Sequence, residues 1–379
     1  MMKKLVSLWL VLLMILPQCI FAADLPDVRA KGAVLIEQES GRILFEKNAF
    51  EPLAMASTTK IMTCILALEK GNLDDIVTAS KRATKAPPTK LHLKVGEKQR
   101  LGDLLRALML ESDNDVAVVV AEHIGGTVEN FCDMMTQKAH EIGAVHASFK
   151  TPNGLDSEGH QASAHDMAII AAYALKNPEF QKIVTTETYT FPSTRLEGSE
   201  RHDLQNKNRF FYSYQGANGI KTGFTNKAGH CFVGGAKKND MQLIAVSLGA
   251  GWGKAGKTRK YTDVINMMNY GFNNYEKVTV LSPSEHIAEV PVEKALVSKT
   301  ELNCNATIVL PLNKEEKEKI TLKKVLPTTL KAPIKAGQEI GEIQILCDDV
   351  VLAKAPMVTS QDIKKATVLD YIKDWISKR

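Results

Sequence analysis

The sequence has no CxxC pair and no HExxH motif, which argues against a zinc site of common spacing and against a disulfide framework. Of its six cysteines, Cys19 lies in the N-terminal apolar segment, and the others occur singly at Cys64, Cys132, Cys231, Cys304 and Cys347. The first three of those five have apolar neighbours and are predicted to be buried thiols. Cys304 and Cys347 share the C-terminal region, and the sequence leaves open whether they pair in an oxidising compartment.

The chain also lacks low-complexity runs and internal repeats. With 379 residues, of which 44% are hydrophobic and 24% charged, it is predicted to fold around a large core in more than one domain. The net charge of +5 is spread along the chain, which argues against a nucleic-acid partner. A mild positive excess suits a negatively charged partner such as a cell wall or a lipid surface.

The first residues have the pattern of a secretory signal peptide. Lys3 and Lys4 precede an uncharged stretch, residues 5–23, whose centre is almost purely apolar and whose end carries the small residues Ala22 and Ala23. An uncleaved transmembrane anchor is the alternative, but the apolar centre is short for a span of about 20 residues. We therefore expect export and cleavage after Ala22 or Ala23, with residues 1–23 removed.

The rest of the chain divides into three parts. Residues 24–275 alternate strand-like and helix-like segments, which predicts an α/β domain of roughly 250 residues. Residues 276–360 contain short strand-like runs separated by proline, glycine and charged clusters, which predicts a small β-sandwich-like domain. Residues 361–379 are predicted to form a helix.

Individual elements follow from hydrophobic periodicity and from turn residues. In the first domain, helices are predicted at 57–69 (ended by Gly71), 104–110 and 128–142, a hairpin at 32–36 and 43–46, and strands at 220–223, 231–236 and 242–248. In the second domain, strands are predicted at 278–280, 287–292, 306–310, 320–322 and 343–346.

The predicted C-terminal helix is basic and amphipathic. From Asp362 onward, the apolar residues fall mostly on one side: Ile363, Val368, Leu369, Ile372, Trp375 and Ile376. Lysine and arginine fill much of the other side. A helix of this kind lies well in a membrane interface, but the sequence is equally compatible with a helix that packs on its own domain.

Three short motifs carry reactive side chains, and each occurs once in the chain. They are Ser57-Thr58-Thr59-Lys60 (SxxK), Ser112-Asp113-Asn114 (SxN) and Lys221-Thr222-Gly223 (KTG). A serine hydroxyl needs a base before it is a useful nucleophile. Because residues three apart on a helix share a face, the Lys60 amine is expected to reach the Ser57 oxygen. Burial, or a second cation such as Lys221, would lower the lysine pKa enough for this task.

Each motif is weak evidence when taken alone. About one SxxK match is expected by chance in a chain of this length. The non-catalytic interpretation of this motif is therefore an ordinary pair of residues on a helix surface. Ser112–Asn114 is compatible with a helix N-cap, or with a hydroxyl that relays a proton and an amide that holds a substrate. Lys221–Gly223 is compatible with a solvated edge strand. Alternatively, its lysine and threonine bind a carboxylate while Gly223 lets a substrate backbone approach closely.

The order of the three motifs is much more specific, because SxxK, SxN and KTG in this sequence are characteristic of penicillin-binding proteins and serine β-lactamases. The chain resembles the low-molecular-mass penicillin-binding proteins, the D-alanyl-D-alanine carboxypeptidases of the peptidase S11 family. Family-like segments extend beyond the motifs, at residues 56–63, 96–110, 151–156 and 219–229. The resemblance is close over about 28–275 and looser in the β domain and terminal helix. It implies an α/β (α+β) β-lactamase/D,D-peptidase-like fold followed by a small all-β domain.

The resemblance also implies roles for individual residues. Ser57 would be acylated by the penultimate D-alanine of a peptidoglycan pentapeptide, or by a β-lactam, and Lys60 would be its base. Ser112 would relay protons between Lys60 and Lys221. The remaining roles concern substrate binding. Asn114 would contact the acyl amide, and the backbone N–H groups of Ser57 and Phe224 would form the oxyanion hole. The terminal carboxylate and the edge strand would be bound by Lys221, Thr222 and Gly223, with help from Arg259.

Two residues depart from the family pattern. Met55 stands where the family usually has proline, and Asp113 replaces the usual glycine of the middle motif, as in many β-lactamases. Neither change removes a reacting group, but both leave substrate preference open. A β-lactamase is the nearest alternative. It is disfavoured because no ExxxN motif lies between Asn114 and Lys221 and because a C-terminal β domain is unexpected in that class.

Two further alternatives are a zinc D,D-peptidase and a non-enzymatic wall-binding protein. His160, His165 and Asp166 are close in sequence, but no comparable ligand set accompanies them, so they are interpreted as structural and neither metal nor cofactor is expected. The intact Ser57 and Lys60 argue for an enzyme. We expect an exported protein, in the periplasm or on the cell surface, held on the outer face of the cytoplasmic membrane by its terminal helix.

Overall fold

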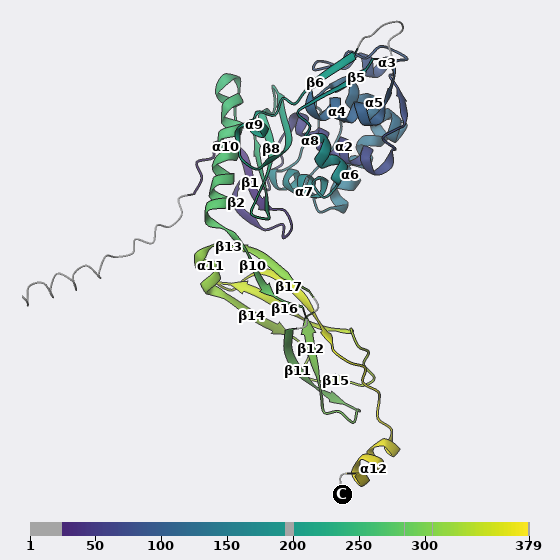
Figure 1. Cartoon of the computed structure of the whole chain (residues 1–379), viewed down its shortest axis with the longest axis vertical. Coiled ribbons are helices and arrows are strands. Elements are labelled where there is room, and N and C mark those ends of the chain that lie inside the picture. The colour runs from purple at the N-terminus through teal and green to yellow at the C-terminus, as the bar shows by residue number, and fades with distance from the viewer. Residues whose placement is uncertain (1–24, 194–200, 284, 305, 378–379) are drawn as a thin grey trace, which may run out of the picture.

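The computed structural model describes residues 25–193, 201–283, 285–304 and 306–377. The signal peptide predicted at residues 1–23 lies outside these ranges. Figure 1 shows an α/β part at one end of the described chain and an elongated β part that leads to a short C-terminal helix at the other end.

The α/β part is built on a five-stranded antiparallel sheet in the order β2-β1-β9-β8-β7. Its strands are β1 (Gly32–Glu37), β2 (Ile43–Lys47), β7 (Ala217–Thr225), β8 (Gly229–Lys238) and β9 (Met241–Leu248). The predicted hairpin and the three predicted strands are confirmed. Because β7 is at the edge of the sheet, one side of its backbone has no strand partner within this sheet.

Both faces of the sheet are covered. Successive side chains of a strand point to opposite faces, so Ala33 and Leu35 pack in one apolar cluster and Val34 and Ile36 in another. The long helix α10 (Gly253–Asn274) covers the first face, and helices of the other lobe cover the second. The active-site strand β7 is thereby held between two packed layers.

A helical lobe fills the space beyond the second face (Figure 1). Its helices are the 3-10 helix η1 (Ala56–Thr59), α2 (Lys60–Lys70), α3 (Lys81–Thr84), α4 (Leu101–Leu110), α5 (Asn114–Gly125), α6 (Val128–Glu141), α7 (Ala164–Ala174) and α8 (Pro178–Val184). Two small hairpins complete it: β3 (Ile76–Thr78) with β4 (Lys98–Arg100), and β5 (Thr188–Pro192) with β6 (Arg201–Gln205). The short helix α9 (Arg209–Ser213) lies on the side of α10, where Phe210 packs in the same cluster as Val264.

Helix α2 lies at the centre of this lobe, because every residue from Lys60 to Ala67 is buried. The helices predicted at 57–69, 104–110 and 128–142 are all confirmed. The first of them begins as a single 3-10 turn, so that Ser57 sits on η1 and Lys60 on the first residue of α2.

The second domain contains a six-stranded sheet in the order β14-β16-β17-β12-β11-β15 and a separate pair, β10 with β13. Its elements are β10 (Glu276–Leu281), β11 (Glu285–Glu293), β12 (Lys299–Cys304), β13 (Ile308–Leu312), α11 (Lys314–Lys319), β14 (Ile320–Val325), β15 (Leu330–Lys331), β16 (Glu339–Cys347) and β17 (Val350–Thr359). All five strands predicted here are found. The strands β12, β15 and β17 and the helix α11 were not predicted.

Cys304 and Cys347 are both free thiols. Along β17, Cys304 is opposite Met357 and Cys347 is opposite Val350. Seven residues of strand span roughly 23 Å, whereas the Cα atoms of a disulfide are less than about 7 Å apart. The strand register therefore rules out a bond between these two cysteines in this fold.

The terminal helix α12 (Val368–Ser377) begins later than predicted. The sequence pattern placed its start at Asp362 and counted Ile363 among its apolar residues. In the structure, Ile363 is buried and forms a β-bridge with Ile334. Ile363 is therefore part of the core of the β domain, and the apolar side of the helix starts at Val368.

Candidate active site

A cavity of about 350 Å³ lies between β7, the helical lobe and α10. It brings together most of the predicted site residues: Ser57, Ser112, Asn114, Lys221, Thr222, Gly223 and Phe224. These residues come from three segments far apart in the sequence. Lys60 is completely buried and contacts Ser57 from beneath.

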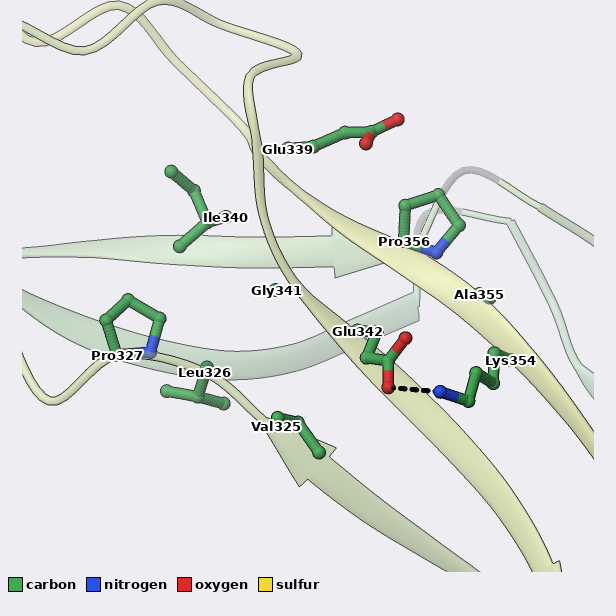
Figure 2. Close-up of a pocket in the computed structure, with 10 residues that line it drawn as sticks. All are labelled: Val325, Leu326, Pro327, Glu339, Ile340, Gly341, Glu342, Lys354, Ala355 and Pro356. Carbon is green, nitrogen blue, oxygen red and sulfur yellow. Dashed lines mark hydrogen bonds and ion pairs between the residues drawn. The ribbon is translucent and has the colours of Figure 1, made fainter. Parts of the chain in front are cut away.

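A larger cavity of about 760 Å³ lies in the β domain, among the ends of β14, β16 and β17 (Figure 2). Val325, Ile340 and Pro356 provide apolar surface there, and an ion pair joins Glu342 to Lys354 at 2.9 Å. This cavity contains no serine, cysteine or histidine in its lining. The smaller cavity therefore carries the chemistry.

The turn that presents Ser57 is held by its own side chains. The hydroxyl of Thr58 donates to the carbonyl oxygen of Met55 at 2.6 Å, and that of Thr59 donates to Ala56 at 2.8 Å. Ala56 has a positive φ of 49°, which is uncommon for a residue with a side chain. Ser57 is thus fixed on a sharp turn rather than within a regular helix.

Two glycines let neighbouring backbone approach this turn closely. A Cβ on Gly223 would lie 2.8 Å from the backbone nitrogen of Ser57. A Cβ on Gly154, which has a φ of +85°, would lie 2.0 Å from the carbonyl oxygen of Ala56. A side chain fits at neither position. Strand β7 and the loop that contains Gly154 therefore hold the turn of Ser57 from two sides, an arrangement called the clamp below.

Lys60 has three polar neighbours around its Nζ atom. The distances are 2.6 Å to the carbonyl oxygen of Asn153, 2.7 Å to Oδ1 of Asn114 and 3.0 Å to Oγ of Ser57. The first two neighbours only accept hydrogen bonds. A neutral amine has two hydrogens and one lone pair, so donation to these two acceptors leaves the lone pair for the Ser57 hydroxyl.

The orientation of the Asn114 amide follows from its other contacts. Its Nδ2 donates to the carbonyl oxygens of Pro87 and Pro88, each at 3.0 Å. Both are obligatory acceptors, so the amide nitrogen must face them and Oδ1 must face Lys60. In this structure Asn114 orients Lys60, and its predicted contact with the acyl amide of a substrate stays a prediction.

The two lysines of the site are strongly perturbed. Burial, and secondly the charge of Lys221, hold the pKa of Lys60 well below its usual value. Burial, and secondly the charge of Lys260, lower the pKa of Lys221 to about 7. A lysine base at neutral pH needs this kind of environment.

Ser112 lines the cavity with a φ of +72°, a left-handed conformation rare outside glycine and asparagine. Its carbonyl oxygen accepts a hydrogen bond from the Thr89 hydroxyl at 2.8 Å. Within the described residues, no hydrogen bond joins its hydroxyl to Lys60, which has other partners, or to Lys221, which donates to the carbonyl oxygen of Thr222 at 3.2 Å. The predicted proton relay through Ser112 stays a prediction.

Arg259 does not line the cavity, although its neighbour Lys260 does. The Nη1 of Arg259 donates to the carbonyl oxygen of Ala250 at 3.3 Å, away from the reactive residues. Lys260 is nearly buried, and burial lowers its pKa to about 8. Lys221 and Lys260 thus line the same cavity, and the predicted help of Arg259 in binding a carboxylate stays a prediction.

Sequence reasoning missed three other contributors. The carbonyl oxygen of Asn153 accepts a hydrogen bond from Lys60. Every residue has a backbone carbonyl, so this contact could not be predicted from the residue type. Asn208 lines the cavity, and its buried Nδ2 has no hydrogen-bond partner among the described residues, so it is available to a ligand. His230 lines the same cavity behind Phe224, with the rings 4.5 Å apart.

His160 supports the nucleophile turn. Its Nδ1 accepts from the backbone N–H of Lys150, and its Nε2 lies 3.0 Å from the hydroxyl oxygen of Thr59. Because Nδ1 is an acceptor, the proton is on Nε2 and is donated to Thr59. Burial lowers the pKa of His160 to about 4.

Asp166 forms a capping box with Ser163 at the start of α7, and the ring of His165 packs against Phe50. These contacts give the histidine-rich segment a structural role, as interpreted from the sequence. Over the described ranges, no group of three or more His, Cys, Asp and Glu side chains is placed to hold a metal ion.

Comparison with known proteins agrees with this arrangement. A sequence model of the D-alanyl-D-alanine carboxypeptidases, peptidase S11, matches residues 20–251, and one of the C-terminal domain of penicillin-binding protein 5 matches 275–365. The D-alanyl-D-alanine carboxypeptidase DacF of Bacillus subtilis is 36% identical over 357 residues, with coverage of 91% of this chain and 90% of its own. DacC of Escherichia coli is 29% identical, with 93% and 89% covered.

Solved structures are similar over nearly the whole chain. Penicillin-binding protein 5 of Haemophilus influenzae superposes with a TM-score of 0.78 at 28% identity, covering 90% of this chain and 99% of that one. Penicillin-binding protein 6B of Escherichia coli gives a TM-score of 0.68 at 26% identity, with 89% and 98% covered. Both domains, and not only the catalytic one, therefore have counterparts of known structure.

The clamp on the nucleophile turn predicts a strong effect of Gly154→Ala. The added Cβ must displace the Ala56 carbonyl, so we expect acylation of Ser57 by a fluorescent penicillin to slow by more than about tenfold. Gly143→Ala is the matched control, because Gly143 also has a positive φ, of 96°, but its Cβ would meet nothing within 4 Å. Equal acylation rates in the two variants would contradict the clamp.

The buried His160 predicts a pH-dependent stability. Its pKa is lower in the folded state than the value of about 6.5 in an unfolded chain, so the unfolded state binds more protons between these values. The free energy of unfolding should therefore fall as pH drops from about 6.5 towards 4, by on the order of 3 kcal/mol from this residue. Urea unfolding followed by tryptophan fluorescence at several pH values measures it. His160→Gln should be less stable at pH 8 but show a flatter dependence; an unchanged slope would refute the assignment.

Proposed function

The chain belongs to the D-alanyl-D-alanine carboxypeptidase family, peptidase S11, and on this premise we propose that it removes the terminal D-alanine of peptidoglycan stem peptides through an acyl-enzyme on Ser57. The observation that carries the residue assignment is the Lys60 amine. It is completely buried, and its nitrogen lies within hydrogen-bond distance of Asn114, Asn153 and, at 3.0 Å, Ser57. In the neutral form of Lys60, donation to Asn114 and Asn153 would leave the lone pair for the Ser57 hydroxyl.

In the proposed acylation, Ser57 Oγ attacks the carbonyl carbon of the penultimate D-alanine while its proton moves to Lys60. The carbon–nitrogen bond to the terminal D-alanine then breaks, and the proton passes to the leaving amine. Hydrolysis of the ester by water restores the free serine. A β-lactam enters the same sequence, because its strained amide is attacked by the same oxygen, which accounts for penicillin binding by the family.

The proposed oxyanion hole consists of the backbone N–H groups of Ser57 and Phe224. Its support is the close approach of β7 to η1, which Gly223 permits. The substrate peptide is expected to lie along the free edge of β7 as an added strand, since an unpaired strand edge offers backbone groups to an extended peptide. Its terminal carboxylate would then meet Lys221, Thr222 and Lys260 on the cavity wall.

We further propose that the protein is exported and rests on a membrane surface through α12. Its large apolar side chains, from Val368 to Ile376, are between 47% and 76% exposed. Exposed lysines accompany them, including Lys364, Lys365 and Lys373. Figure 1 shows α12 at the end of the chain opposite the α/β part, so that a helix in the interface would hold the active site away from the lipid. No helix among the described residues is long and apolar enough to cross a bilayer.

Ser57→Ala tests the nucleophile. We expect it to abolish covalent labelling by a fluorescent penicillin and to reduce D-alanine release from a D-Ala-D-Ala pentapeptide by at least about a thousandfold. Ser360→Ala, a change at an exposed serine of the β domain, is the control and should behave as the parent protein. Labelling that survives in Ser57→Ala would overturn the serine mechanism, and release that survives but stops with a chelator would indicate metal chemistry.

Truncation after Thr367 tests the membrane surface. This cut removes α12 but keeps the bridge between Ile334 and Ile363, so the β domain should stay intact. We expect the truncated protein to lose binding to phosphatidylglycerol vesicles while its acylation rate stays unchanged. The full-length double variant Ile372→Glu, Trp375→Glu should show the same loss. Vesicle binding that persists in both would refute the role of α12.

A further inference from the structure

The turn between β11 and β12, residues 294–298, exposes two large apolar side chains and is named the distal turn. Leu296 is 50% exposed and Val297 is 41% exposed, and among the described residues neither packs in an apolar cluster of the β domain. Turns usually consist of glycine, proline, asparagine, aspartate or serine, which suit the required backbone conformations. Two adjacent aliphatic side chains in water therefore need an explanation outside the fold of the domain.

The distal turn is joined to the start of α12. The backbone N–H of Ala366 donates to the carbonyl oxygen of Lys294 at 2.8 Å. The hydroxyl of Tyr371 donates to the carbonyl oxygen of Ala295 at 3.3 Å. Figure 1 shows α12 at the same end of the β domain as β15, which pairs with the last residues of β11. The turn and the helix therefore lie together at one end of the β domain.

The distal turn borders the apolar side of α12. Because successive residues of a helix are about 100° apart, an arc of roughly 100° contains four exposed apolar residues of α12, Val368, Ile372, Trp375 and Ile376. Tyr371, which contacts the turn, is about 40° from Trp375 and thus stands at the edge of this arc. The exposed aliphatic side chains of the turn therefore extend an apolar surface that α12 begins.

Lysines surround this apolar surface. Lys294 begins the distal turn, and Lys365 precedes the residue whose N–H binds the turn. Lys331 of β15 is the register partner of Glu293, directly before the turn. All three lysines are exposed. Cations beside exposed aliphatic side chains fit a surface of anionic lipid, in which negative headgroups cover an apolar interior.

We propose that the distal turn is a second lipid-binding element, whose Leu296 and Val297 enter the headgroup region of an anionic membrane beside α12. The proposal rests on the membrane contact of α12 proposed above. Because membrane affinity scales with the apolar area that is buried, two side chains are too few to hold the protein alone, and the turn acts together with α12. A helix and a turn that bind together hold the β domain in one orientation relative to the membrane.

The first test removes the apolar side chains without adding charge. Residues 24–379, the exported form proposed above, are compared with the double variant Leu296→Ser, Val297→Ser for binding to vesicles of phosphatidylglycerol and phosphatidylcholine. We expect the dissociation constant of the variant to rise by about tenfold or more, because the bound surface loses two aliphatic side chains. An unchanged dissociation constant would overturn the proposal, even if removal of α12 abolished binding.

The matched control is Val350→Ser, Val351→Ser. These two valines are 62% and 41% exposed, much like the pair in the distal turn, but they lie near α11 at the other end of the β domain. Their replacement should leave vesicle binding unchanged. Acylation of Ser57 by a fluorescent penicillin should be equal in all of these variants, which shows that each is folded.

The second test measures the position of the turn directly. The cysteines of the described residues are all buried, so Leu296→Cys provides an exposed thiol for an environment-sensitive fluorophore such as NBD. We expect its emission to increase and to shift to shorter wavelength when the labelled protein binds the vesicles, whereas the same label at Val350→Cys should not respond. A label at position 296 that stays in water while the protein is bound would contradict the proposal.

Two other outcomes identify a different error. If Leu296→Ser, Val297→Ser changed self-association in analytical ultracentrifugation without lipid, but not vesicle binding, the turn would be a contact between copies of this chain and the lipid role would be wrong. A parent protein that bound no vesicles would refute the membrane contact of α12 together with that of the turn. The acylation of Ser57 tests the proposed enzymatic function independently of both.

Discussion

The arrangement of the active site depends on the amine of Lys60, which is buried away from water in the protein interior. Lys60 is fully buried in the first turn of the central helix α2, where an uncompensated ammonium is disfavoured. The fold resolves this by surrounding the amine with acceptors from two other segments, Asn114 of α5 and the Asn153 carbonyl. The same acceptors hold the amine nitrogen 3.0 Å from the Ser57 oxygen. The requirement to bury the base and the requirement to orient it are therefore met by the same contacts.

These segments can come together only because glycine occupies the positions where a side chain would not fit. Gly154 and Gly223 bring a loop and the edge strand β7 against the turn that carries Ser57. Positive φ values at Ala56 and Ser112 mark the same region as strained. Such strain is maintained only because the packed faces of the sheet and of α2 hold these segments from both sides. Among the described residues, the second domain adds no group to the cavity, and α12 lies at the far end of that domain (Figure 1).

Periodicity and turn residues predicted the five strands of the first sheet and three helices of its domain, but not α5, α7 or the long helix α10. The order of the three motifs predicted which residues share the cavity, while their chemical roles stay predictions. The helix that begins with Ser57 and Lys60 was predictable because a three-residue spacing has a fixed geometric meaning. The role of Arg259 stays a prediction, because its side chain does not line the cavity and successive residues of a helix are about 100° apart. On α10 that rotation turns Lys260, rather than Arg259, into the cavity. The Asn153 carbonyl and the β-bridge at Ile363 depend on tertiary contacts that residue type does not encode.

In the proposed reaction, the two buried lysines on the cavity wall would favour a substrate that ends at the residue after the scissile bond. Lys221 and Lys260 line the same cavity, and each lies largely out of water. Burial, and secondly the charge of Lys260, lower the pKa of Lys221, so an anion placed beside the two lysines would remove an unfavourable interaction as well as form a new one. The terminal carboxylate of a peptide provides that anion, whereas a peptide bond in the middle of a chain does not. Under the proposed function, any transition-state stabilisation from this wall would be available only when the residue after the scissile bond is the last one.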